Sequence, residues 1–204
     1  KKENDDGPNL IYIPESPFQM NTFLSQVKTV FNKYGRCVIA ISEGIQDKNK
    51  KLISQKITKK TEYDAHGNIQ LSGTGSLGDY LSGEIKEKLK LPRVRADTLG
   101  YPQRCFLGST SEIDQKEALK IGIFAAKYSN KNNTSFSAGI LERKNFTTPY
   151  RTTFIANPLE KVAGKTKIMP KSFYNVKKSF VTNLFINYSL PLIGKKILKT
   201  KSII

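Results

Sequence analysis

Tryptophan is absent from the 204-residue sequence, His66 is the sole histidine, and Cys37 and Cys105 are the two cysteines. One histidine and two distant cysteines do not form the ligand cluster of a zinc site, so no zinc is expected. The cysteine spacing indicates reduced, half-buried thiols in an intracellular protein. No apolar run approaches the roughly 18 residues that a membrane span needs. The sequence therefore predicts a protein without a membrane partner.

An initiator methionine is also missing, and the opening stretch KKENDDGPN is charged. We therefore expect no signal peptide, a cytoplasmic location, and a chain that begins inside a longer protein. The length suits one well-packed domain over residues 1–204. The basic tail KKILKTKSII, residues 195–204, is expected to fray.

Positive charge is plentiful, because 34 basic residues face 17 acidic ones and give a net charge of +17. Such a surplus suits nucleic acid, an anionic membrane or phosphorylated ligands. The lysines are scattered, however, and form no stripe with interleaved aromatics of the kind that binds nucleic acid. We expect no nucleic-acid partner, and a non-catalytic basic binding module is the alternative to an enzyme.

Apolar spacing predicts an α/β fold, a three-layer arrangement in which helices flank a mostly parallel sheet. NLIYI (9–13) and RCVIAIS (36–42) are expected strands, joined by a helix that ends at Gly35. Strand, helix and strand over this length form a βαβ unit. RCVIAIS is apolar throughout and should be buried on both faces. Further expectations are a loop or short helix within 44–68, helices at 77–89 and 111–128, a strand at 93–99, a hairpin of strands 135–143 and 147–157, a helical turn after Pro158, and a last helix broken by Pro191.

Three glycines, Gly73, Gly75 and Gly78, fit the G-x-G-x-x-G spacing of a dinucleotide-binding turn, and Asp97 follows at a suitable distance. In such a site the turn directly follows a buried strand. The preceding residues DAHGNIQL are mostly polar, so we interpret the glycines as a turn that leads into a helix. A phosphate at that helix N-terminus is the weaker alternative.

The most informative stretch is RVRADTLGYPQR, residues 93–104. Strand alternation places Arg93, Arg95 and Asp97 on one face, and three charges there are costly to bury unless paired. Ligands of parallel sheets bind beyond the carboxyl ends of strands, and the arginine fork suits phosphate. Either this loop grips a phosphate, or it holds a structural Arg–Asp pair beside a surface loop. The side chains in the loop are Tyr101, Gln103 and Arg104.

Glu43 and Gly44 follow the apolar strand at 36–42. A carboxylate at the carboxyl end of a strand is well placed to accept hydrogen bonds from sugar hydroxyls. A capping or surface glutamate is the alternative. Together the two strand ends describe a pocket for a sugar phosphate, with arginine for the phosphate and glutamate for the hydroxyls.

Motifs along nearly the whole chain resemble the carboxyl-terminal half of the 6-phosphofructokinases. The resemblance is strongest to the pyrophosphate-dependent branch and its atypical ATP-using relatives, and the motifs stand in the order of that family. They are IPESPF (13–18), SEG (42–44), RVRADTLGYPQR (93–104), SEIDQKEA (111–118), LEKVAGKTKIMP (159–170) and PLIG (191–194).

The resemblance implies site residues for fructose 6-phosphate. Glu43 would hold the sugar, and Tyr101 and Arg104, with Gln103 between them, would hold its phosphate. Arg95 would reach the site of a neighbouring subunit, which implies a homo-oligomer. The glycines at 73–78 carry no nucleotide role in this family.

The resemblance also implies an incomplete enzyme. Nothing in the sequence matches the family's G-G-D donor loop, its T-x-D-x-D segment with the catalytic base, or its M-G-R segment. No catalytic residue is therefore expected in this chain, and Mg²⁺ would be bound mainly by the missing lobe. That lobe would also bind the donor, pyrophosphate or ATP, for the glycolytic reaction. An inactive remnant of a phosphofructokinase is the other alternative.

Overall fold

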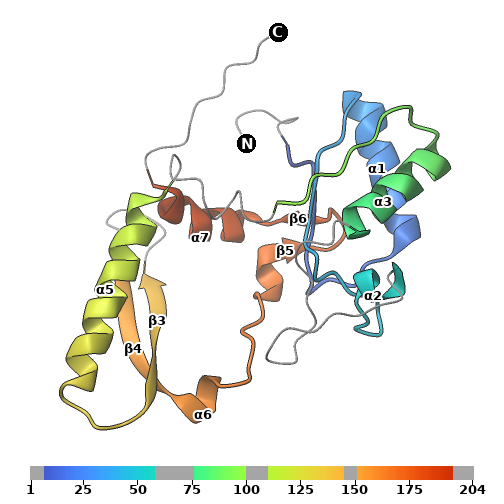
Figure 1. The fold of residues 1–204 in the computed structure, drawn as a ribbon. Coiled ribbons are helices and arrows are strands. Elements are labelled where there is room, and N and C mark those ends of the chain that lie inside the picture. Colours follow the sequence, from blue (N-terminus) through green and yellow to red (C-terminus); the bar gives the residue numbers. More distant parts are fainter. Residues whose placement is uncertain (1–6, 58–75, 100–109, 145–150, 195–204) are drawn as a thin grey trace. The chain divides into compact units, whose positions relative to one another are not determined.

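The computed structural model describes residues 7–57, 76–99, 110–144 and 151–194 (Figure 1). The chain divides into two compact units. The first consists of residues 1–104 and 174–181, and the second of residues 105–173 and 182–204. A single domain over the whole chain stays a prediction. The tail at 195–204 lies outside the described residues.

The first unit opens with the predicted βαβ motif. Strand β1 (Leu10–Tyr12) and strand β2 (Ile39–Ile41) pair in parallel, with helix α1 (Met20–Tyr34) between them. The helix ends at Gly35, whose φ of 67° lies in the left-handed region that glycine tolerates. Its N–H donates to the carbonyl of Phe31 at 2.7 Å. The sequence prediction of this motif is confirmed.

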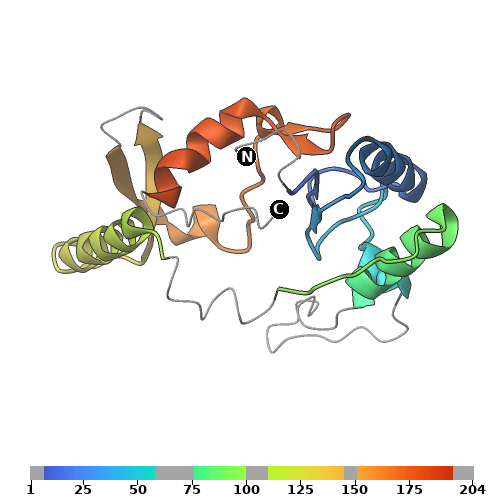
Figure 2. The ribbon, with the colours of Figure 1, turned by 90° about the horizontal axis from the view of Figure 1, so that it is seen from above.

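The core of the first unit lies on one side of the β1–β2 pair. Figure 2 shows α1, α2 (Ile53–Ile57) and α3 (Ser76–Leu89) on that same side. The rings of Tyr12, Phe18 and Phe23 meet there with centroids 5.3–5.6 Å apart. Aliphatic side chains at helical spacing complete the core; they include Val27, Leu77, Leu81 and Ile85. The predicted helix at 77–89 is confirmed.

Two expectations for the sheet are wrong. Strand β2 is covered on one face only: Ile39 and Ile41 pack against the core, whereas Val38 is 51% exposed and Ala40 is exposed too. Residues 93–99 form no strand but an extended segment. The two differences have separate causes. Helices α1, α2 and α3 pack on one face of the β1–β2 pair (Figure 2), which leaves Val38 and Ala40 on the other face exposed. Segment 93–99 has no hydrogen-bonded neighbour strand among the described residues.

A short hairpin that the sequence analysis did not predict completes the first unit. It consists of β5 (Tyr174–Asn175) and β6 (Phe180–Val181). The N–H of Ile11 donates to the carbonyl of Ser179 at 2.8 Å, and the hydroxyl of Tyr174 donates to the carbonyl of Ile11 at 2.6 Å. The hairpin therefore covers the edge of β1 that faces away from β2.

The second unit contains the predicted helix and hairpin. Helix α5 (Glu112–Ser129) begins as expected, because the Oγ of Ser111 accepts a hydrogen bond of 3.2 Å from the N–H of Asp114. Strands β3 (Phe136–Lys144) and β4 (Arg151–Pro158) pair antiparallel and form a separate two-stranded sheet. Helix α6 (Leu159–Val162) follows Pro158 as predicted, and the short turn η2 spans Lys171–Phe173.

Helix α7 (Asn183–Ile193) runs through Pro191, so the expected break at this proline is wrong. The proline lies in the last turn, where its missing N–H removes a single helical hydrogen bond. The hydroxyl of Ser111 donates to the carbonyl of Leu192, which satisfies an acceptor at the end of the helix.

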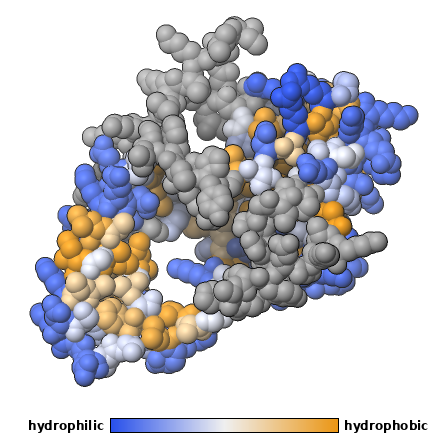
Figure 3. All heavy atoms as spheres, viewed as in Figure 1, coloured by the Kyte–Doolittle hydropathy of each residue, from blue (hydrophilic) through white to orange (hydrophobic). Residues whose placement is uncertain are grey.

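Apolar side chains of the second unit remain at its surface. The ring of Tyr128 packs against that of Phe136 with centroids 4.6 Å apart. Leu119 and Ile123 of α5 are nevertheless 66% and 45% exposed, and Leu141 is 58% exposed. Figure 3 shows hydrophobic residues gathered over α5 and the β3–β4 hairpin. Among the described residues, no helix is both long and apolar enough to cross a membrane.

Candidate functional site

The turn after β2 positions Glu43. The N–H of Gly44 donates to Ser42 Oγ at 3.2 Å, and the N–H of Ile45 donates to the Ser42 carbonyl at 3.3 Å. A Cβ built on Gly44 would lie 3.4 Å from Cγ of Pro14, so the SEG and IPES motifs pack together. Glu43 is half-buried at the carboxyl end of a parallel strand, where ligands of α/β proteins bind.

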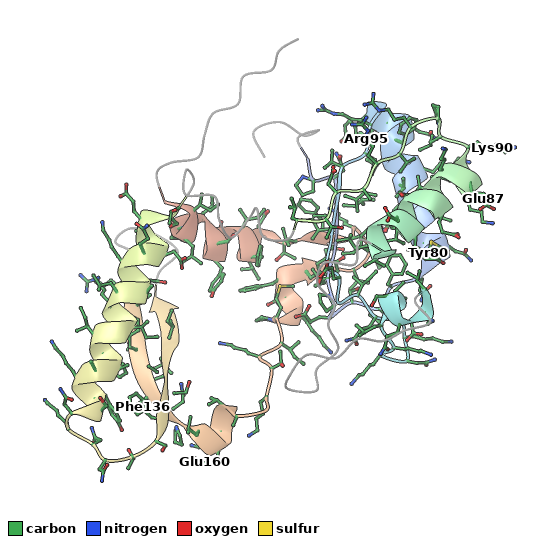
Figure 4. The ribbon with its side chains drawn as sticks, in the orientation of Figure 1. Tyr80, Glu87, Lys90, Arg95, Phe136 and Glu160 are labelled. Atoms are coloured by element: carbon green, nitrogen blue, oxygen red, sulfur yellow. The ribbon has the colours of Figure 1, made fainter. Side chains whose placement is uncertain are left out.

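Arg95 lies on the extended segment 93–99, which follows α3 (Figure 4). Gly78 of α3 fixes the orientation of this segment. A Cβ at Gly78 would lie 3.0 Å from the Cβ of Ala96 and 3.9 Å from Oγ1 of Thr98. Because side chains alternate along an extended chain, Arg95 and Asp97 point away from α3. The contacts of Ala96 and Thr98 with α3 agree with the face predicted for these two residues, although the segment is not a strand.

A cavity of about 950 Å³ brings the two motifs together within the first unit. Its walls are β2 with the following turn, one side of α3, and residues 94–99. Glu43, Arg95 and Asp97 all line it. Within the described segment 93–99, no ion pair joins Arg93 or Arg95 to Asp97, so a structural Arg–Asp pair gains no support. Both charge types are therefore available to a ligand that carries hydroxyl and anionic groups.

Cys37 also lines this cavity and is half-buried, as predicted. Burial raises the pKa of its thiol to about 11, so the thiol is protonated at neutral pH. The sequence analysis did not assign Cys37 to a site.

Other predicted site residues cannot be placed in this cavity. Tyr101, Gln103 and Arg104 lie outside the described residues, as do Gly73, Gly75, His66 and Cys105. The described part of the chain contains no group of three His, Cys, Asp or Glu side chains that could hold a metal ion. These residues do not fit a Mg²⁺ site by themselves.

A parallel βαβ unit with charged side chains beyond a strand end is the arrangement of α/β proteins that bind small ligands. The chain belongs to the phosphofructokinase family, because the sequence model of that family, described as "Phosphofructokinase", matches residues 5–129, more than half of the chain. The resemblance found in the motifs is thereby confirmed.

The relatives include pyrophosphate–fructose 6-phosphate 1-phosphotransferases. The protein of that name from Rhodospirillum rubrum is 46% identical over 195 residues, which cover 96% of this chain and 47% of the relative. The one from Xanthomonas campestris is 32% identical, with 93% and 43% covered. A sulfofructose kinase from Alkalicoccus urumqiensis is 28% identical, with 85% and 42% covered. The chain thus spans about half the length of the curated relatives it matches.

Solved structures share the fold. A crystal structure of a pyrophosphate-dependent phosphofructokinase from Nitrosospira multiformis matches with a TM-score of 0.72 at 24% identity. The match covers 96% of this chain and 43% of that one. The corresponding Marinobacter aquaeolei structure gives 0.72 at 23% identity, with 98% and 44% covered. The α/β fold class is confirmed by these likenesses.

Proposed function

We propose that this chain is the fructose 6-phosphate-binding portion of a 6-phosphofructokinase. The observation that carries the proposal is the cavity of the first unit, which Glu43 lines at the carboxyl end of β2 and which residues 94–99, just before the G-Y-P-Q-R turn, line from another motif of the family. Glu43 accepts hydrogen bonds from sugar hydroxyls. Tyr101, Gln103 and Arg104 follow segment 93–99 directly and bind the 6-phosphate. Arg95 assists at the site of a neighbouring subunit in a homo-oligomer.

The proposed reaction is phosphoryl transfer to O1 of fructose 6-phosphate in glycolysis, in the cytoplasm. The sugar O1 forms a bond to phosphorus, the bond to the leaving phosphate breaks, and a base removes the hydroxyl proton. Mg²⁺, when bound, neutralises charge on the donor phosphates. This chain contributes the positioned acceptor, and the protein beyond it contributes the base and the donor site. By itself, the chain is inactive.

Pyrophosphate is the proposed donor, with ATP as the alternative. Two relatives with at least 30% identity over most of this chain carry pyrophosphate in their names. The sulfofructose kinase among the relatives suggests a second sugar, sulfofructose, for the same site. Both sugars should therefore be compared in one binding experiment.

Calorimetric titration of the purified chain with fructose 6-phosphate tests the proposal. We expect saturable binding that is weakened about 10- to 150-fold by Glu43→Gln or Arg104→Ala, because each removes a hydrogen bond that involves a charged group. Glu87→Gln is the matched control, since Glu87 is exposed on α3 and does not line the cavity. Absence of saturable binding, or equal affinities for all variants, would contradict the proposal.

Two further measurements separate the alternatives. The chain with fructose 6-phosphate, pyrophosphate and Mg²⁺ should form no fructose 1,6-bisphosphate unless the complementary half is added. A basic binding module would instead bind duplex nucleic acid, with an affinity that falls steeply between 50 and 200 mM salt, about 10³-fold or more for six phosphate contacts. We expect no such binding.

A further inference from the structure

The turn that carries Glu43 is anchored at both ends. Before the turn, the N–H of Ser42 donates to the carbonyl of Tyr12 at 3.0 Å and so continues the pairing of β1 with β2. After the turn, the side chain of Ile45 is completely buried, and its carbonyl accepts a hydrogen bond of 3.1 Å from the N–H of Ile53. Between these anchors, only Glu43 and the glycine after it can change their backbone conformation without disturbing the core.

Gly44 is the least restrained residue of this turn. Its φ lies outside the left-handed region, and a Cβ at this position would make an ordinary contact of 3.4 Å with Cγ of Pro14. The conformation of the turn therefore does not require glycine, and glycine has more backbone freedom than any other residue. Unless another group holds the N–H of Gly44, the peptide group after Glu43 can adopt several orientations, and the carboxylate of Glu43 can occupy several positions.

Ser42 provides the group that holds this N–H. Its Oγ accepts a hydrogen bond of 3.2 Å from the N–H of Gly44, and its carbonyl accepts one of 3.3 Å from the N–H of Ile45. Serine and threonine hydroxyls commonly stabilise turns by such bonds to the backbone two residues further on. One side chain therefore fixes the backbone on the far side of Glu43, and it does so without touching a ligand.

The position of the turn connects this hydrogen bond to binding. Ser42, Glu43 and Gly44 follow the last residue of β2 and line the cavity side by side. All three are half-buried. A carboxylate that already has its binding orientation loses less conformational freedom when a ligand arrives, and the ligand is then bound more tightly. The hydroxyl of Ser42 should therefore raise the affinity of a ligand that Glu43 contacts.

We propose that Ser42 is a positioning residue for the sugar site. Its hydroxyl holds the N–H of Gly44 and thereby fixes the carboxylate of Glu43 where it accepts hydrogen bonds from the hydroxyls of a sugar phosphate. This inference rests on the proposed function and adds to it a residue that acts through Glu43. A direct hydrogen bond from the Ser42 hydroxyl to the sugar is the rival assignment, since Ser42 lines the cavity as well.

A double-mutant cycle on the full 204-residue chain separates the two assignments. Calorimetric titration with fructose 6-phosphate compares the unmodified chain, Ser42→Ala, Glu43→Ala and the double variant. We expect Ser42→Ala to weaken binding about tenfold, because the N–H of Gly44 loses its acceptor and Glu43 loses its fixed orientation. In the Glu43→Ala background, the same substitution should weaken binding less than about twofold, because no carboxylate remains to be oriented.

A pair of variants with the same shape tests the hydroxyl itself. Ser42→Thr keeps the Oγ acceptor and should bind fructose 6-phosphate within about twofold of the unmodified chain, whereas Ser42→Val lacks the acceptor and should bind about tenfold more weakly. This pair also decides the question if Ser42→Ala does not fold. Thr29→Ala is the control, because Thr29 Oγ1 also bonds to the backbone, at 2.9 Å from the Ser25 carbonyl, but is exposed on α1 and does not line the cavity.

Amide exchange in the absence of sugar tests the structural premise. The Gly44 amide should exchange about tenfold faster in Ser42→Val than in Ser42→Thr, because only threonine can accept its hydrogen bond. Because no ligand is present, this result does not depend on the proposed function. Equal exchange of the Gly44 amide in the two variants would overturn the inference.

The binding data can overturn the inference in three ways. Equal affinities of the unmodified chain and Ser42→Ala would exclude a positioning role and leave the proposed function intact. A loss of the same size in the Glu43→Ala background would assign Ser42 a direct contact with the sugar instead. Absence of saturable binding by the unmodified chain would contradict the proposed function, and the inference with it.

Discussion

The hydroxyl of Tyr12 donates a hydrogen bond of 2.6 Å to Oε1 of Gln26, and the same oxygen accepts a bond of 2.8 Å from Ser179 Oγ. The Nε2 of Gln26 donates to the carbonyl of Lys177 at 3.1 Å. Tyr12 and Ser179 are 8% and 5% exposed. Burial raises the pKa of Tyr12 above its usual range, so its hydroxyl remains a donor. One glutamine therefore joins α1 to β1 and to the hairpin at 174–181.

Gln26→Ala should lower the free energy of unfolding of the first unit by about 2–3 kcal/mol, because it leaves two buried hydroxyls without their acceptor. Gln26→Glu keeps an acceptor oxygen and loses the Nε2 donor, so its loss should be smaller. Urea unfolding followed by tyrosine fluorescence measures both, since the chain has no tryptophan. Equal losses for the two variants would contradict the role of Oε1.

The thiol of Cys37 should react slowly at neutral pH. Its pKa of about 11 is raised by burial, against about 8.5 for an exposed thiol. In a Cys105→Ser background, the rate of alkylation by iodoacetamide should reach half its maximum near pH 11. A midpoint near pH 8.5 would show that the cavity wall at Cys37 is open to water.

The same shift has a consequence for stability. A pKa raised in the folded state means that the buried neutral thiol contributes stability below the unfolded pKa, about 8.5, and that this contribution is lost as the pH rises toward 11. Cys37→Ala should therefore show a flatter decline of the melting temperature across this range than the Cys105→Ser chain. Parallel declines for the two chains would be contrary evidence.

Local sequence patterns were sufficient to predict several elements of the fold. The 3- and 4-residue spacing from Phe23 to Tyr34 predicted α1, and glycine at 35 predicted its end, because both signals depend on residues within one helix. Ser111 likewise marked the start of α5. These elements need no distant partner to form their hydrogen bonds.

Elements whose strands pair with distant parts of the chain were predicted less well from the sequence. RCVIAIS reads as an interior strand, yet among the described residues β2 has a neighbour strand on one side only, β1, and segment 93–99 has none. The hairpin at 174–181 was missed because its strands have two residues each and its stability comes from Ile11 and Gln26, more than 140 residues away. The sequence analysis predicted one pocket from the strand end at Glu43 and the stretch 93–104. That segment 93–99 packs against α3 at Gly78 was not predicted, because the glycine pattern had suggested a different role for Gly78.

Asp47 should make the first unit sensitive to acid. Lys56 Nζ lies 2.7 Å from its Oδ2, and the N–H groups of Asn49 and Lys51 donate to Oδ1 at 2.8 and 3.0 Å. The Lys56 bond, followed by these N–H groups, holds the pKa of Asp47 below its usual value. The contribution to stability is therefore present above the unfolded pKa, about 3.9, and is lost as the pH falls through the lower folded value.

The Asp47→Asn variant tests this sensitivity. It should be less stable than the unmodified chain at pH 7 and approach it in stability as the pH falls below the lowered pKa of Asp47, where both side chains are neutral. Lys56→Met keeps the two backbone donors to Asp47, so its stability at pH 7 should lie between those of Asp47→Asn and the unmodified chain. Melting temperatures from pH 2 to 7 give the comparison, and a pH-independent difference between the chains would exclude ionisation of Asp47 as the cause.

Two glycines of the same helix, α3, should respond differently to alanine. A Cβ at Gly83 meets nothing within 4 Å, so Gly83→Ala should stabilise the first unit by about 0.5–1 kcal/mol through helix propensity. At Gly78 the new Cβ would lie 3.0 Å from the Cβ of Ala96, and segment 93–99 would have to shift. The free energy of unfolding of Gly78→Ala, measured with urea, should therefore be at least about 1 kcal/mol lower than that of Gly83→Ala. In the double variant Gly78→Ala/Ala96→Gly, the clash is removed and the stability gain expected of an alanine in α3 should return. Equal gains for Gly78→Ala and Gly83→Ala would mean that segment 93–99 does not pack against α3.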